Sequence, residues 1–426
     1  MSFQTTRRDL LTASAAFFGS SALPLKTPSS WEKLNVGFVG VANRASSNVN
    51  GVAGENVVAV CDIDENYLAS VAKRFPKAKV YHDYREMLDK EKLDAAVIST
   101  ADHNHAPATM RALERGMHVY CEKPLSHTVE EARAVAELAA KKGVATQMGT
   151  QIHAGGNYRR VVELIQGGAI GAVKEVHVAC GKGWGGNGMP AGEHVVPKHF
   201  HWDLWLGPAA ERPFHPGYHP ANWRRYWDFG GGTMSDMACH LMDLPFWALD
   251  LRHPTKVVAK GEVPNDYSAP HGLEVSYEFP ARGGRAACEL TWYDGNRKPI
   301  GMELNGLPGV GFGVLFVGEK GNLFSDYGAH RLMPEEDFAD FEAPAPSIPD
   351  SIGHYAEWIK ACKEGTPTTC NFDYSGALTE SVLLGSVAYR AQQDLVWDAA
   401  KLTATNCAKA DEFVRKEYRE GWSLRG

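Results

Sequence analysis

Two short segments carry side chains that could move or hold a proton. In GGGTMSDMACHLMD, residues 230–243, Asp236 and His240 stand four positions apart, so a helix would place both on one face. A carboxylate beside an imidazole orients the ring and raises its basicity, which suits a general base near neutral pH. In E-K-P, residues 122–124, Lys123 could present an ammonium that polarises a hydroxyl or carbonyl. The alternatives are a solvated polar helix pair and a surface lysine.

The segment NVGFVGVANRASS, residues 35–47, reads as a strand, a tight turn and a helix. In the dinucleotide-binding pattern G-x-G-x-x-G, the glycines permit the turn, the close approach of the pyrophosphate and tight helix packing. Here the pattern reads Gly40, Ala42 and Ala45, so only the first glycine is present. Asn43 and Arg44 offer an amide and a guanidinium where a phosphate would lie, beside a helix N-terminus. We therefore expect the turn itself, residues 40–44, to contact the bound dinucleotide.

The second strand-like run, VVAVCD, ends in Asp62, 22 residues after Gly40. A carboxylate at this distance typically accepts the ribose hydroxyls of the adenosine. Asp64 adds a second negative charge, which would repel a 2′-phosphate, so NAD is favoured over NADP. Arg44 keeps NADP open as the alternative cofactor.

Two further strand-like runs also end in polar residues. DAAVIST ends at Thr100, just before DHNH at 102–105, and MHVYC ends just before Glu122 and Lys123. The carboxyl ends of parallel strands share one edge of the sheet, where open α/β sheets bind ligands. We therefore expect Thr100, His105, Glu122 and Lys123 at the ligand edge of the sheet, with Lys123 able to present its ammonium to a substrate.

A stretch rich in Gly, His, Trp and Pro, residues 181–232, is too long for an ordinary connection. Aromatic faces stack on the C–H faces of pyranoses, while Arg and His bond their hydroxyls. The stretch therefore predicts a carbohydrate site, made of Trp184, His199, Trp202, Tyr218, Trp223 and Arg224. Its histidines have no recognised zinc spacing, so the expectation is that no metal is bound.

The elements around these motifs divide the chain into two domains. Over residues 31–150, short Val/Ile/Ala-rich runs without alternation separate helical patterns, which indicates a doubly wound α/β domain with a parallel sheet between helix layers. Over 151–385, alternating runs such as LEVSYEF predict an α+β domain with an open, mainly antiparallel sheet. Residues 386–426 are expected to pack back on the body.

Composition excludes several classes of partner. With 426 residues, 44% hydrophobic and 22% charged, the chain is an ordinary globular protein of more than one domain. The net charge is −7 and the basic residues are not clustered, which argues against nucleic acid and against an anionic membrane surface.

The N-terminus, residues 1–30, has the order of an export signal and linker. Arg7 and Arg8 precede the moderately apolar run LLTASAAFFGSSAL, which is typical of twin-arginine signals. The run is too short and too rich in Ser to insert stably in a membrane. We therefore expect export of the folded chain to the periplasm, the alternative being a disordered N-terminus with a chance arginine pair.

Taken together, these motifs resemble those of the Gfo/Idh/MocA oxidoreductase family. The resemblance covers about residues 34–390 and rests on the Gly40 turn, Asp62, the T-x-x-x-x-H loop from Thr100 to His105, E-K-P, and GGG-x-x-x-D-x-x-x-H-x-x-D. It implies a Rossmann domain followed by an open-sheet domain that often forms homo-oligomers. The resemblance assigns Lys123 and His240 to catalysis with Asp236 assisting, and it assigns to the cofactor side Asp62, Asn43, Arg44, His105 and Glu122.

The resemblance implies an NAD(P)-dependent dehydrogenase that moves a hydride between the carbinol carbon of a sugar, polyol or glycoside and a tightly held nicotinamide. A second function stays open: an NAD-dependent glycosidase that works by transient C3 oxidation, elimination and re-reduction, as some members of the family do. A third is a sugar-responsive binding protein without turnover, which the intact Lys123, Asp236 and His240 disfavour.

Overall fold

The computed structural model describes residues 32–192 and 194–425. The expected export signal, residues 1–30, lies outside the described residues. Within the described part of the chain, no helix combines the length and the apolar character needed to cross a membrane.

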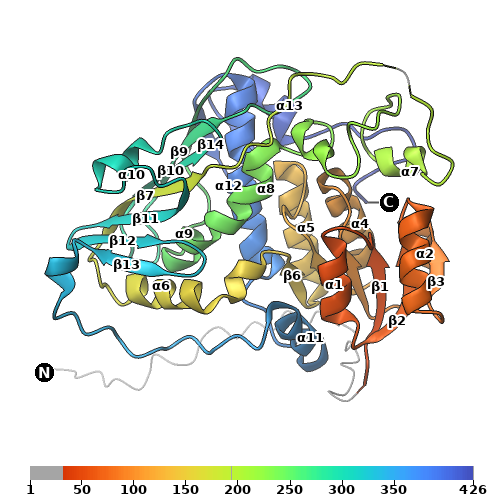
Figure 1. Ribbon diagram of the computed structural model, residues 1–426, viewed down its shortest axis with the longest axis horizontal. Helices are drawn as coiled ribbons and strands as arrows, with labels where there is room; N and C mark the ends of the chain where they lie inside the picture. Colours follow the sequence, from red (N-terminus) through yellow and green to blue (C-terminus); the bar gives the residue numbers. More distant parts are fainter. Residues whose placement is uncertain (1–31, 193, 426) are drawn as a thin grey trace, which may run out of the picture.

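The first domain is built on a six-stranded parallel sheet with the order β3-β2-β1-β4-β5-β6 (Figure 1). Its strands are β1 (Asn35–Val39), β2 (Asn56–Cys61), β3 (Lys79–Tyr81), β4 (Ala95–Ile98), β5 (His118–Cys121) and β6 (Thr146–Met148). All four residues of β4 are buried, because helices cover both faces of the sheet. The strand order reverses between β1 and β4, which places a ligand crevice at their carboxyl ends, as the Rossmann prediction requires.

Five helices connect these strands. They are α1 (Ala45–Val52), α2 (Glu65–Arg74), α3 (Tyr84–Lys90), α4 (His105–Glu114, after the 3₁₀ turn η1 at Asp102–Asn104) and α5 (Val129–Lys142). Side-chain caps fix three of the starts: Asp64 and Asp83 accept backbone N–H groups of α2 and α3, and Thr128 opens a capping box with Glu131 on α5. In contrast, α1 begins without a side-chain cap.

The second domain carries a nine-stranded sheet with the order β13-β12-β11-β7-β10-β9-β8-β14-β15. The strands are β7 (Val173–Cys180), β8 (Lys256–Gly261), β9 (Leu273–Phe279), β10 (Cys288–Asp294), β11 (Phe312–Gly318), β12 (Gly321–Ser325), β13 (His330–Met333), β14 (Leu395–Asp398) and β15 (Thr403–Ala404). β10 runs parallel to β7 and the other pairs are antiparallel, which confirms the expected, mainly antiparallel sheet.

Eight helices belong to the rest of the described chain. They are α6 (Gly156–Gln166), α7 (Trp202–Leu206), α8 (Gly232–Leu241), α9 (Asp243–Ala248), α10 (Ile300–Leu304), α11 (His354–Glu364), α12 (Phe372–Ala391) and α13 (Asp411–Val414). The short 3₁₀ turns are η2 (Gln151–Ala154), η3 (Asn222–Arg225), η4 (Glu335–Phe338) and η5 (Ala408–Ala410).

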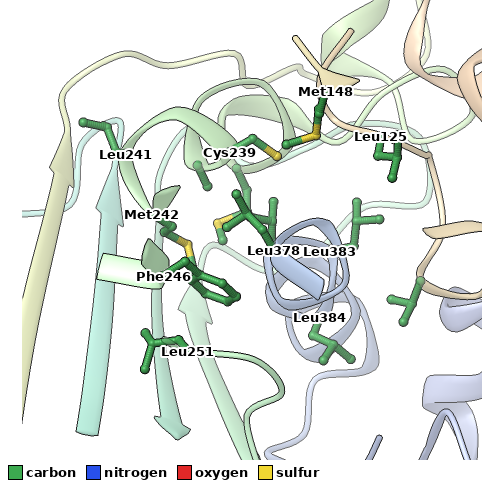
Figure 2. Close-up of a cluster of buried hydrophobic side chains, with 14 of the residues drawn as sticks. Leu125, Met148, Cys239, Leu241, Met242, Phe246, Leu251, Leu378, Leu383 and Leu384 are labelled. Atoms are coloured by element: carbon green, nitrogen blue, oxygen red, sulfur yellow. The ribbon is translucent and has the colours of Figure 1, made fainter. Parts of the chain in front are cut away.

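Helix α12 joins the two domains. It packs against α5 of the first domain and α8 of the second, and its side chains are buried on almost every side. Figure 2 shows Leu378, Leu383 and Leu384 packed among apolar side chains around α8 and α9. A helix buried on almost every side belongs in the interior, so α12 holds α8 at a fixed position beside the Rossmann domain.

The C-terminal segment returns to the first domain. Arg415 pairs with Glu130 of α5 at 3.2 Å, and the Trp422 ring packs on Tyr84 with Arg85 stacked 3.9 Å from its centroid. This segment therefore covers the Rossmann helices near the start of α3.

Candidate functional site

The turn between β1 and α1 forms one wall of a cavity of about 210 Å³. Gly40 has φ +84°, and a Cβ there would lie 2.5 Å from the carbonyl oxygen of Ser99, so only glycine fits. Asn43 also has positive φ, +54°. The uncapped N-terminus of α1 and the bare backbone of the turn fit the pyrophosphate of a dinucleotide, which such helix starts bind.

Asp62 lies at the end of β2 on the same cavity, where the ribose prediction places it. Its Oδ2 accepts the N–H of Val41 at 2.9 Å and its Oδ1 accepts that of Asp64 at 3.1 Å, which fixes the carboxylate beside the turn. Burial raises the pKa of Asp62 to about 6 despite these bonds.

Arg44 lines the cofactor cavity, and other side chains of the site already engage part of its guanidinium. Its Nε lies 3.1 Å from Oε1 of the buried Glu122, and its Nη2 donates to Gln151 Oε1 at 3.3 Å. Glu122 Oε1 also accepts from Asn48 at 3.0 Å, and Asn48 in turn accepts from Tyr355 OH at 2.8 Å. No motif points to Asn48, Gln151 or Tyr355, because they come from three separate segments.

A second cavity, of about 220 Å³, adjoins the first. The two share wall residues Arg44, Ser99, Thr100, Trp223 and Arg224. The second is also lined by all three predicted catalytic side chains, Lys123, Asp236 and His240. The structure therefore brings E-K-P of the first domain and the Asp/His helix of the second domain into one site.

A buried ion-pair cluster forms the centre of this second cavity. Lys123 Nζ lies 2.7 Å from Asp236 Oδ1 and 2.7 Å from the Asp236 carbonyl oxygen, and Arg224 Nε lies 2.9 Å from the same Oδ1. Burial alone would raise the pKa of Asp236, but the two cations hold it well below its usual range. Burial likewise opposes the charge on Lys123, yet Asp236 raises the pKa of Lys123 above its ordinary value. Lys123 therefore stays an ammonium.

Asp236 does not assist His240 through a hydrogen bond, as the spacing suggests it would. Its carboxylate faces Lys123 and Arg224, and the buried Nδ1 of His240 has no hydrogen-bond partner among the described residues. Burial, with Lys123 adding to it, lowers the pKa of His240 well below its usual value. A spacing of four places two residues on one helix face. The direction of the Asp236 carboxylate, however, is set by cations from distant segments of the chain.

Asp102 is a titratable group of this cavity to which the sequence motifs assign no role. It is 4% exposed, it lines the cavity, and its carboxylate accepts no hydrogen bond within the described chain. Burial raises the pKa of Asp102 to about 7, against the lowering influence of Arg224 and Lys123. Its position after β4, on the ligand edge of the sheet, is the signal that could have identified it.

His105 connects backbone segments of the site. Its Nδ1 lies 2.7 Å from the Pro124 carbonyl oxygen and its Nε2 lies 3.0 Å from that of Thr100. Thr100 lines both cavities, and its hydroxyl donates to the Ala101 carbonyl at 3.1 Å. His105 thus positions the loop after β4 against the E-K-P turn that carries Lys123.

The predicted carbohydrate residues separate into different surroundings. Trp202 and Tyr218 are buried in an aromatic cluster of the long loop, with Trp202 stacked 4.9 Å from Trp205. Both side chains are buried, so neither presents a face to a sugar in this structure. Trp184 lines neither cavity, and its backbone N–H donates to Thr233 Oγ1.

The other three lie closer to the cavities. Trp223 and Arg224 line both of them. His199 lies at the edge of the Rossmann domain, with Nε2 3.7 Å from Asp64 Oδ2. A backbone bridge between Asp64 and Phe200 ties this part of the loop to the start of α2. The loop then crosses the cofactor cavity, where it contributes Leu204, Trp205, His219, Pro220 and Ala221 to the lining.

Two family models match the chain over consecutive segments. Residues 34–150 match an oxidoreductase family with an NAD-binding Rossmann fold. Residues 156–277 match the C-terminal alpha/beta domain of the same oxidoreductase family. The match agrees with the turn, the ribose carboxylate and the adjoining polar cavity, and it confirms NAD as the cofactor.

Curated relatives match over part of their length. Inositol 2-dehydrogenase of Salmonella typhimurium is 30% identical over 150 residues, which are 34% of this chain and 45% of the relative. Alpha-N-acetylgalactosaminidase of Shewanella oneidensis is 30% identical over 165 residues, 36% of each chain. The chain thus matches less than half the length of either relative.

Solved structures share the fold at low sequence identity. The WlbA dehydrogenase of Chromobacterium violaceum, in complex with NADH and UDP-GlcNAcA, has a TM-score of 0.62 at 18% identity and covers 88% of this chain and 99% of its own. Levoglucosan dehydrogenase, in complex with NADH and levoglucosan, has a TM-score of 0.58 at 16% identity, over 86% of this chain and all of its own.

We expect Asp236→Asn to destabilise the protein by about 1.5–3 kcal/mol, because it removes the anion that two partly buried cations share. Chemical denaturation, followed by circular dichroism, measures the change. The matched control is Asp373→Asn, which removes an exposed partner of Arg252 and should cost less than about 1 kcal/mol. Equal losses in the two variants would contradict a structural ion-pair cluster at Asp236.

Proposed function

The chain belongs to the Gfo/Idh/MocA family of NAD-binding oxidoreductases, and from this premise we propose that it moves a hydride between the carbinol carbon of a sugar, polyol or glycoside and a tightly held NAD. One observation carries the proposal: the polar cavity that holds the Lys123 ammonium, Asp102 and His240 shares a wall with the cofactor cavity. The substrate class is supported by the relatives, which are named for inositol and for a galactosaminide.

NAD, when bound, supplies the hydride acceptor. The turn at 40–44 and Asp62 would hold its pyrophosphate and adenosine ribose, while Thr100 stands where the two cavities meet. The long loop lines the cavity from the opposite side, which would slow exchange of the cofactor.

Lys123 orients the substrate and stabilises charge on its oxygen. Because Asp236 keeps Lys123 protonated, the ammonium donates a hydrogen bond to the substrate hydroxyl and does not accept the proton at neutral pH. Arg224 adds a second positive charge on the same wall. Both cations favour a developing alkoxide, so they lower the barrier to its formation.

Asp102 takes the hydroxyl proton in our proposal. A base works best when its pKa lies near the working pH, and the pKa of Asp102, about 7, meets this condition. His240, whose pKa is lowered well below the usual value, is neutral there and serves as a hydrogen-bond partner for the substrate.

A broad panel of compounds tests the proposed activity on the holoprotein. We expect mass spectrometry of the small molecules released from denatured protein to detect NAD. We expect at least one sugar, polyol or glycoside of the panel to change the nicotinamide absorbance of the holoprotein. A holoprotein that responds to no carbinol substrate, and to no keto-sugar when its cofactor is reduced, would refute the proposal.

A glycosidase is the second candidate, and the match to the Shewanella galactosaminidase is what favours it. Elimination from an oxidised glycoside requires a proton acceptor beside the sugar, which Asp102 would supply, while the Lys123 ammonium would stabilise charge on the substrate oxygen. In the same panel, release of the aglycone without net reduction of the cofactor would select the glycosidase, and accumulation of a keto-glycoside would select the dehydrogenase.

We expect Asp102→Asn to remove one limb of the pH profile. The wild-type kcat/KM for oxidation should fall as the pH drops below about 7, because protonated Asp102 cannot accept a proton. Asparagine never accepts one, so the variant should lose about 10²–10⁴ in rate and lack this limb. Asp373→Asn, at an exposed site, is the control. A variant that retains the limb at the same pH would assign the base to another group.

We also propose that the protein is exported folded by the twin-arginine route, with its cofactor inside. The proposal rests on Arg7, Arg8 and the apolar run that follows. Replacing both arginines with lysine should shift the protein from the periplasmic to the cytoplasmic fraction of cells, as judged by immunoblot. An unchanged distribution would exclude this route.

A further inference from the structure

Three side chains with metal-binding groups converge at the edge of the cofactor cavity. One ligand atom each from Glu65, His82 and His201 lie within 4.8 Å of one another. Glu65 is the first residue of α2, His82 follows β3 and lines the cofactor cavity, and His201 is the loop residue just before α7. The Rossmann domain thus supplies two of the groups and the long loop supplies the third. We call these three residues the edge cluster.

His82 has the hydrogen-bond arrangement of a metal ligand. Its Nδ1 lies 3.3 Å from the Asp62 carbonyl oxygen, which only a protonated Nδ1 can bond. The lone pair is then on Nε2. Metal-binding histidines commonly donate the other ring N–H to a carbonyl in this way, which fixes the tautomer and the ring orientation.

His201 carries a ring nitrogen that the described chain leaves unsatisfied. Its buried Nε2 has no hydrogen-bond partner among the described residues, although it lies 3.4 Å from Glu65 Oε1. The His82 and His201 rings stack with centroids 4.1 Å apart. With the proton of His201 on Nδ1, the Nε2 lone pair faces the Glu65 carboxylate, and a cation between the two removes their repulsion.

The backbone holds the edge cluster in place from both sides. The His201 N–H donates to the Ile63 carbonyl at 2.9 Å, and the Glu65 N–H donates to the His199 carbonyl at 3.0 Å. These two bonds flank the bridge between Asp64 and Phe200. The ligands are therefore presented by paired backbone, which reduces the entropy that metal binding must overcome.

We propose that Glu65, His82 and His201 bind a divalent transition metal ion, best matched by Zn²⁺, which fastens the loop onto the Rossmann domain. Two imidazole nitrogens and one carboxylate oxygen are a common zinc ligand set, and the partial exposure of the edge cluster leaves room for water as the fourth ligand. The Glu65 side chain is 52% exposed and free to move onto the ion. Spacing along the chain predicts no metal, because the three ligands come from separate elements.

The position of the edge cluster gives the ion a consequence for the cofactor. Beyond His201, the same loop contributes Trp205 and His219 to the lining of the cofactor cavity. Release of NAD requires this loop to separate from the Rossmann domain, so an ion that bridges the two should slow the release. Zinc binding itself does not depend on which reaction the enzyme catalyses.

Calorimetric titration of the tag-free holoprotein with Zn²⁺ tests the site. We expect one zinc ion per chain with micromolar affinity, confirmed by elemental analysis after dialysis. His82→Ala and His201→Ala should each weaken binding by about tenfold or more. His194→Ala, an exposed histidine of the same loop outside the edge cluster, should leave it unchanged. A wild-type Kd weaker than about 100 μM, or unchanged stoichiometry in the double histidine variant, would overturn the site.

The rate of NAD release, measured with and without EDTA, tests the bridging role separately. We expect EDTA to speed the release from wild type and to have no effect on His201→Ala. Melting temperatures of both variants without zinc should equal that of wild type without zinc, since the replaced rings are partly exposed. Zinc binding with an unchanged release rate would overturn the bridging role and leave the site in place.

Discussion

The site depends on one interaction, the contact of Lys123 with Asp236 and of Asp236 with Arg224. Lys123 comes from the end of β5, Asp236 from α8 and Arg224 from η3, so one carboxylate joins the Rossmann domain, the second domain and the long loop. Two cations converge on one residue, which offsets the cost of burying its charge. The cluster keeps a net positive charge at the cavity wall, where an alkoxide would develop.

Such a cluster works only if the domains hold their relative position. Breaking a buried pair by a small displacement would leave charges unpaired in a medium of low dielectric. The apolar burial of α12 supplies this rigidity, and Arg133 of α5 adds to it by binding the buried Glu380 of α12 at 2.7 Å. The ion pairs of the second cavity therefore depend on the apolar packing shown in Figure 2.

The sequence predicts those parts of the site that follow from repetitive structure. Parallel strands end at one edge, so the order of strands and helices is enough to place Asp62, Thr100 and Lys123 together. It is not enough for the partners of Asp236, because spacing along a helix reports neighbours within that helix and not the cations that other segments bring. Prediction for the long loop is limited in a related way. Aromatic residues such as Trp202 and Tyr218 suit a sugar site and a buried aromatic cluster equally well.

The glycine-poor turn shows how a backbone conformation can persist while the residue types that usually adopt it change. Of the three glycine positions in the dinucleotide pattern, only Gly40 has a conformation and a contact that exclude every side chain. The other position with positive φ in this turn is Asn43, and asparagine is among the residues that tolerate the left-handed region best. Ala42 and Ala45 then need no backbone conformation that favours glycine. A turn that binds NAD is therefore recognised by the positions at which its backbone has positive φ. Counting glycines alone misses such turns.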